Sequence, residues 1–193
     1  MVKACFFCKA NNDSSALFCN VCNTILPYAE TNSFALLDLP CTFQIDKNEL
    51  ETNYFNKLSL VHPDKFIQSS QPEKEIAQEN ASALTAAYEC LKSNYPRALE
   101  LLKVNGYDVN AKINLDSNFL AETIEWREEL LEADDTQAKA LLVRMHNSLK
   151  QHWQSIDELF ASQHLSDASL LLAKIKFVIR FIEEIEERIY GSS

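Results

Sequence analysis

Glycine is almost absent from this chain of 193 residues, with only 2 in the whole sequence. Two-residue β-hairpins and the tight turns of β-sandwiches and barrels depend on glycine, so the sequence predicts helices joined by polar loops. A glycine-rich loop that lets the backbone approach a nucleotide phosphate is excluded for the same reason. We therefore expect an all-α fold without a dinucleotide site.

Other absences narrow the expected partners and location. No apolar run is long enough to span a bilayer, and the N-terminal stretch MVKACFFCKANND lacks a secretory apolar core. The net charge is −10 and no Lys/Arg-rich block is present, so neither nucleic acid nor membrane is an expected partner. We expect a cytoplasmic protein, with the mitochondrial matrix as the alternative if a transit peptide has been removed.

Four of the six cysteines form two Cys-x2-Cys pairs separated by ten residues. The four are Cys5, Cys8, Cys19 and Cys22. This spacing is typical of a closed, structural Zn²⁺ site with four thiolate ligands, and a head of about thirty residues needs such a metal to fold. The alternatives are two disulfides, a redox pair or an iron–sulfur cluster. The missing secretion signal and the missing βαβ context disfavour the first two.

The stretch DKNELETNYFNKLSLVHPDKF, residues 46–66, predicts an amphipathic helix with Asp46 as its N-cap. Pro63 cannot continue a helix and biases His62 toward an extended conformation, so the helix should end near Val61. A second helix follows IQSSQP. One of its faces is formed by Ile76, Asn80, Ala83, Ala87 and Leu91. The tripeptide His62-Pro63-Asp64 is thus expected on the loop of a helical hairpin, displayed to a partner.

Two other interpretations of this tripeptide compete with partner binding. In a purely structural one, Pro63 breaks the helix and Asp64 caps the next segment, but His62, Lys65 and Phe66 then have no explanation. In a catalytic one, His62 and Asp64 form an acid–base pair, but neither a nucleophile motif nor a pocket-forming glycine loop accompanies them. We therefore do not expect an enzyme.

The C-terminal half predicts three amphipathic helices, near residues 118–133, 136–160 and 171–189. The expected core stripes are Leu141 or Leu142, Met145, Leu149, Trp153, Ile156 and Phe160 on the second helix, and Leu171, Ile175, Val178, Ile182, Ile185 and Ile189 on the third. Short connections imply antiparallel neighbours and hence a three-helix bundle. The predicted parts are a zinc head at 1–30, the hairpin domain at 31–106 and the bundle at 107–193.

At this point the sequence resembles known proteins. A helix, HPDKF, a polar loop and a helix with AAYECLKSNYPRALELL resemble the J-domain of co-chaperones that stimulate a DnaK-class ATPase. Together with FLAETIEWREELLE, YPRALELLKVNGYDV and KIKFVIRFIEEIEERI, the chain from about residue 32 onward resembles the HscB family, the J-proteins of iron–sulfur cluster assembly. The cysteine head resembles the extension of eukaryotic members and of some bacterial ones.

The resemblance implies a co-chaperone that stimulates a DnaK/HscA-class ATPase and delivers the iron–sulfur scaffold protein to it. The implied chaperone-binding residues are His62, Pro63, Asp64 and Lys65, with Lys57 on the preceding helix. The implied scaffold-binding residues are Leu120, Ala121, Ile124, Glu125, Glu128, Glu132 and Phe177. The alternative for Leu120 and Ile124 is the bundle core. The alternative function is a general J-domain protein that serves other clients through its zinc head, and a homodimer is left open.

Overall fold

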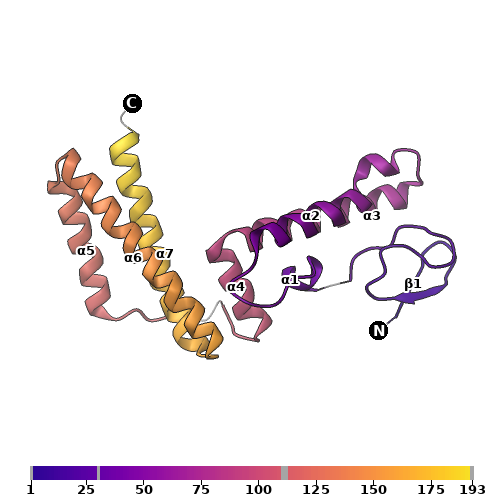
Figure 1. Ribbon diagram of the computed structural model, residues 1–193, viewed down its shortest axis with the longest axis horizontal. Helices are drawn as coiled ribbons and strands as arrows, with labels where there is room; N and C mark the ends of the chain where they lie inside the picture. Colours follow the sequence, from indigo (N-terminus) through magenta and orange to yellow (C-terminus); the bar gives the residue numbers. More distant parts are fainter. Residues whose placement is uncertain (1, 30, 110–112, 192–193) are drawn as a thin grey trace. The chain divides into compact units, whose positions relative to one another are not determined.

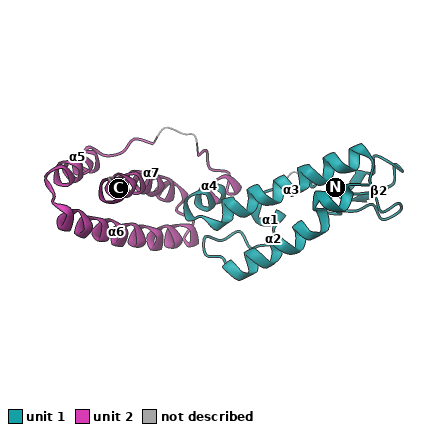
Figure 2. Cartoon of the chain, turned by 90° about the horizontal axis from the view of Figure 1, so that it is seen from above, with its two compact units in different colours: residues 1–100 teal, residues 101–193 magenta. Residues whose placement is uncertain are grey.

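The computed structural model describes residues 2–29, 31–109 and 113–191. The chain divides into two compact units, residues 1–100 and 101–193 (Figure 2). Within the described ranges its elements are helices apart from one two-stranded sheet near the N-terminus (Figure 1), which confirms the all-α prediction with a small N-terminal ribbon. Among the described residues, no helix combines the length and the apolarity that a membrane span requires. The domain boundaries at residues 30 and 106 stay predictions.

The first unit begins with a small head built around the four cysteines. Strand β1 (Val2–Ala4) pairs antiparallel with β2 (Asn11–Asp13), and Phe18 forms an isolated bridge with Ile25. The short helix α1 (Ser33–Leu36) follows the head.

The helical hairpin of the first unit consists of α2 (Lys47–Val61) and α3 (Gln71–Lys92), which lie side by side in Figure 1. Asp46 caps α2, because its carboxylate accepts hydrogen bonds from the backbone N–H groups of Asn48 and Glu49. A capping box between Ser70 and Glu73 starts α3. The connection contains the short 3₁₀ helix η1 (Pro63–Phe66).

The buried face of α3 is rotated slightly from the predicted one. Its buried residues are Ala77, Asn80, Ala81, Leu84, Ala87 and Leu91. Ile76 and Ala83 are only half-buried, because the face follows the i, i+3, i+4, i+7 spacing that starts at Ala77. Helix α4 (Asn94–Val104) follows the hairpin.

The second unit contains α5 (Ser117–Glu132), α6 (Asp135–Ala161) and α7 (Leu165–Tyr190), which confirms the predicted three-helix bundle. Helices α6 and α7 form the main contact of this unit, and α5 packs on α7 (Figure 2). The central cluster is formed by Leu130, Ala133, Ala138, Leu141, Met145, Val178, Phe181, Ile182 and Ile185. On α7 the buried residues begin at Ala168 and include Leu172, while the predicted core residue Leu171 is half-buried.

Candidate functional site

The loop between α2 and α3 takes its shape from Pro63. His62 ends α2 with φ −57° and ψ 130°, an extended conformation that the following proline favours, and Pro63 then starts η1. Val61 and Phe66 on either side are buried and anchor the loop to the hairpin. His62, Asp64 and Lys65 are exposed and Pro63 is half-buried, so the loop presents polar side chains on an apolar base.

The imidazole of His62 is held by its neighbour Asp64. The backbone N–H of Asp64 donates to Nδ1 of His62 over 3.3 Å, and a carboxylate oxygen of Asp64 lies 3.5 Å from the same nitrogen. Because Nδ1 accepts the backbone bond, the proton of the neutral ring lies on Nε2. The side chains of His62 and Asp64 are 47% and 80% exposed, so both are accessible to a partner.

A groove of 560 Å³ runs beside this loop, between α2 and α3. Leu58, His62 and Pro63 line one side, and Ala81 and Thr85 of α3 contribute to the other. The loop therefore sits next to a concave, partly apolar surface that can accept an extended segment of another protein.

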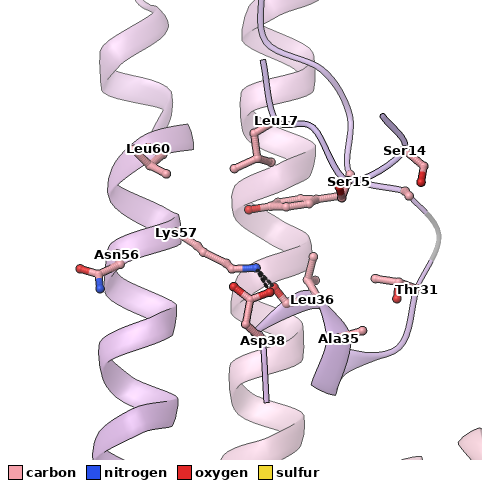
Figure 3. A pocket seen from close by; sticks show the side chains of 12 residues that line it. Ser14, Ser15, Leu17, Thr31, Ala35, Leu36, Asp38, Asn56, Lys57 and Leu60 are labelled. Atoms are coloured by element: carbon pink, nitrogen blue, oxygen red, sulfur yellow. Dashed lines mark hydrogen bonds and ion pairs between the residues drawn. The ribbon is translucent and has the colours of Figure 1, made fainter. Parts of the chain in front are cut away.

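Lys57 does not join this loop. Its ammonium donates to the backbone carbonyl of Leu36 over 2.7 Å and pairs with the carboxylate of Asp38 at 2.8 Å (Figure 3). The Lys57 side chain is only 19% exposed and lines a separate cavity of 650 Å³. Burial, together with Asp38, raises the pKa of Tyr28 in the same cavity to about 12. The predicted role of Lys57 in chaperone binding stays a prediction, and an acidic partner would have to compete with Asp38.

The four head cysteines lie on two turns of the same backbone design. In the first, the N–H of Lys9 donates to the carbonyl of Cys5, and in the second the N–H of Asn23 donates to the carbonyl of Cys19, over 3.0 and 2.9 Å. Lys9 and Asn23 both have left-handed backbones, with φ of 64° and 59°. Each follows the second cysteine of its pair, so the chain reverses in the same way twice and brings both pairs together.

The sulfur atoms fit one tetrahedral metal ion. All four lie within 4.8 Å of one another, and the distances between Cys5 and Cys22 and between Cys8 and Cys19 are 3.6 and 3.5 Å. Four sulfurs about 2.3 Å from a Zn²⁺ ion would be about 3.8 Å apart, so little movement is needed to bind one. Cys5, Cys8, Cys19 and Cys22 would hold the ion, and a four-thiolate shell leaves no open position for catalysis.

Backbone N–H groups prepare the sulfurs for the thiolate state unequally. The N–H groups of Cys22 and Val21 lower the pKa of Cys19 to about 6. For Cys8 the N–H of Ala10 lowers the pKa, but burial and hydrogen bonds with the other three thiols outweigh it and raise the pKa to about 12. A bound cation would displace the protons that the four thiols still carry.

The head is fixed to the hairpin by Asn80, a residue that the sequence placed on the α3 face without a role. The side chain of Asn80 is 2% exposed. Its amide donates to the carbonyl of Leu26 over 3.0 Å and accepts from the N–H of Tyr28 over 2.9 Å. In the sequence, Asn80 stands out only as an asparagine in a stripe of small and apolar residues. Its hydrogen-bond partners could not be predicted from this pattern, because they lie more than fifty positions away.

On α5, the structure places the predicted scaffold-binding side chains on the surface. We call the exposed set Leu120, Ala121, Ile124, Glu125, Glu128 and Glu132 the α5 face. Leu120 and Ile124 are 41% and 57% exposed, so they are not core residues of this unit. Phe177 of α7 is half-buried, with its ring edge against buried Phe119 at 5.9 Å between centroids.

Beneath the α5 face, aromatic and polar contacts hold α5 on α7. Trp126 stacks on Phe181 with 5.7 Å between ring centroids. Asp116, the N-cap of α5, pairs with Lys174 at 2.8 Å, and Arg127 pairs with Glu184 through two hydrogen bonds of 3.1 Å. These contacts fix the orientation of the α5 face at the N-terminal end of the helix and in its C-terminal half.

A helical hairpin with an exposed HPD loop, followed by a helical bundle, defines a J-domain co-chaperone. The family described as "HSCB C-terminal oligomerisation domain" matches residues 115–186. The Iron-sulfur cluster co-chaperone protein HscB homolog of Arabidopsis thaliana is 32% identical over 176 residues, covering 90% of this chain and 70% of that protein. The Co-chaperone protein HscB homolog of Haemophilus influenzae is 31% identical over 169 residues, covering 82% and 97%. The chain belongs to the HscB family of co-chaperones.

The fold agrees with this membership over nearly the whole chain. The crystal structure of human co-chaperone protein HscB superposes with a TM-score of 0.90 at 26% identity. The match covers 98% of this chain and 100% of the human one. Because so few residues of this chain lie outside the match, it includes the cysteine head.

Proposed function

We propose that this protein stimulates the ATPase of a DnaK/HscA-class chaperone through its HPD loop and delivers an iron–sulfur scaffold protein through its α5 face. The single observation that carries the proposal is the exposure of His62, Pro63 and Asp64 on a loop whose flanking residues are buried. Such a loop is rigid at its base and accessible at its tip, which favours docking by a partner. Family membership and the names of the relatives support the link to iron–sulfur cluster assembly.

The chain itself is proposed to do no chemistry. His62 and Asp64 are exposed, and the imidazole nitrogen nearest the carboxylate is occupied by a backbone N–H. A general base must be held within hydrogen-bond reach of the proton that it removes, whereas this pair stands exposed at the tip of a loop, a position better suited to binding than to proton transfer.

The test is the variant His62→Gln, with His146→Gln on α6 as the matched control. We expect His62→Gln to abolish stimulation of the chaperone ATPase while its affinity for the scaffold protein stays unchanged. His146→Gln should behave as the wild type in both assays. Normal ATPase stimulation by His62→Gln would refute the assignment of the HPD loop.

A second candidate is a J-domain protein whose head binds other clients. One observation favours it: Phe7 and Val21, at matching positions of the two cysteine turns, are 72% and 71% exposed. Full ATPase stimulation together with no binding of purified scaffold protein would select this candidate. Loss of client binding in Phe7→Ser would then locate the contact on the head.

A further inference from the structure

The apolar part of the α5 face does not end at Ile124, because a further exposed apolar side chain, Leu131, follows on the same helix. Leu131 is 80% exposed, more than any other large apolar side chain in the described part of the chain. Single exposed leucines are common on protein surfaces and need no explanation by themselves. Leu131 is of interest because it lies on the same side of α5 as Leu120 and Ile124.

The three residues form one stripe along the helix. Leu131 lies 11 positions after Leu120, which is about three helical turns, so the two side chains point within about 20° of each other. Ile124 lies between them, about 40° from Leu120. The exposed stripe therefore spans about 16 Å, about two thirds of the length of α5.

The fold does not use Leu131. The buried side of α5 is formed by Phe119, Thr123 and Leu130, and Leu130 belongs to the central cluster of the bundle. The adjacent leucine thus fills the core position at this end of the helix. An isolated polar substitution at residue 131 would leave these contacts in place.

The charges around the stripe indicate what kind of surface could cover it. Glu125, Glu128 and Glu132 are exposed on one edge and form no ion pair with any described residue, whereas Arg127 on the other edge is neutralised by Glu184. The stripe is therefore an apolar strip beside uncompensated carboxylates. A partner with an apolar ridge and a basic rim complements it, while a second copy of this chain, with net charge −10, would bring like charges together.

We infer that Leu131 is a further partner-contact residue that extends the apolar part of the α5 face toward the C-terminal end of the helix, and that the partner covering it is the iron–sulfur scaffold protein. This inference rests on the proposed function. It assigns the partner a second apolar contact about 16 Å from the one that meets Leu120, with lysine or arginine side chains opposite Glu128 and Glu132.

The test measures the affinity of the full chain for purified iron–sulfur scaffold protein. Leu131→Ser should weaken binding about tenfold, and Leu131→Met should restore it to within about twofold of the wild type. The matched control is Val143→Ser on α6, which removes another exposed aliphatic side chain, 60% exposed, and should leave affinity unchanged. Unchanged thermal midpoints of all variants would show that the fold is intact.

The outcomes separate this inference from the proposed function. If Leu120→Ser weakens binding and Leu131→Ser does not, the inference fails and the proposed function stands. If the wild-type chain does not bind scaffold protein at all, the proposed function fails and the inference with it. If Leu131→Ser changes only a monomer–dimer equilibrium in sedimentation velocity, the occupant is a second copy and the inference is wrong.

Discussion

Asn80 connects the cysteine head to the hairpin, and its hydrogen bonds allow the loss of stability on removing its side chain to be estimated. In Asn80→Ala the buried carbonyl of Leu26 loses its donor and the N–H of Tyr28 loses its acceptor. A buried polar group left without a partner costs about 1–3 kcal/mol. Leu26 is 1% exposed and bears this cost fully, whereas Tyr28 is half-buried and regains part of it from water.

The expected loss for the pair is about 2–4 kcal/mol, and alanine returns about 0.6 kcal/mol through its higher helix propensity. We therefore expect Asn80→Ala to lower the free energy of unfolding by about 1.5–3.5 kcal/mol. Asn80→Asp should lower it further, because a carboxylate oxygen would face the carbonyl of Leu26 in a buried position. The matched control is Gln78→Ala, an exposed amide two positions away, which should stay within about 0.5 kcal/mol of the wild type.

The assay is urea unfolding of the zinc-loaded chain followed by far-ultraviolet circular dichroism, with amide hydrogen exchange of Tyr28 as the local readout. Both tryptophans, Trp126 and Trp153, lie in the second unit, so their fluorescence reports on that unit alone. We expect faster exchange at Tyr28 in Asn80→Ala. An unfolding free energy within about 0.5 kcal/mol of the wild type, with unchanged exchange, would refute the contact as a stabilising one.

Two further predictions concern the metal and the pH. Cys19→Ser should reduce bound zinc from about one ion per chain to none by metal analysis, while Cys41→Ser, which changes an exposed cysteine outside the cluster, should keep it; equal zinc in both variants would contradict the site. Burial lowers the pKa of His152 on α6, and Lys174 lowers it further, against the opposing effects of the Ser148 backbone and Glu122. As the pH falls, His152 therefore binds a proton in the unfolded state before it does so in the folded state. The second unit should consequently lose stability as pH falls through about 6.5. His152→Gln should flatten this dependence in denaturant unfolding followed by tryptophan fluorescence, and an unchanged slope would exclude His152 as its source.

Local sequence patterns were sufficient to predict a site where it is built from residues that are close together in the sequence. Pro63 dictates the conformation of His62 and the end of α2, and two Cys-x2-Cys turns dictate a sulfur cluster, so both features could be predicted from short stretches. Lys57 shows the limit of this reasoning. It looks like a free surface lysine on an amphipathic helix, but its partner Asp38 lies 19 positions earlier, on a turn with a φ of 53° that no local pattern indicates.

The α5 helix shows why exposure could not be read from hydrophobicity. Thr123 is 5% exposed and its neighbour Ile124 is 57% exposed, the reverse of what their polarities predict. Thr123 satisfies its buried hydroxyl by donating to the carbonyl of Leu120 in the preceding turn, so a polar residue is tolerated in the core. With apolar residues on both sides of the helix, its tertiary contacts, among them the packing of Phe119 and Trp126 against α7, decide which side faces solvent.

Leu26 shows how the metal site and the hairpin depend on each other. Its side chain packs with Cys5 and Cys19 in the head core, while its carbonyl accepts the hydrogen bond from Asn80 of α3. The residue after Asn80, Ala81, lines the groove beside His62 and Pro63. If the head unfolds without metal, the buried side-chain amide of Asn80 therefore loses both hydrogen-bond partners. Asn80 lies on the same turn of α3 that contributes Ala81 to this groove. The α5 face shares none of these residues, because it belongs to the second unit. Variants that disturb the metal should consequently affect the hairpin before they affect the proposed scaffold binding.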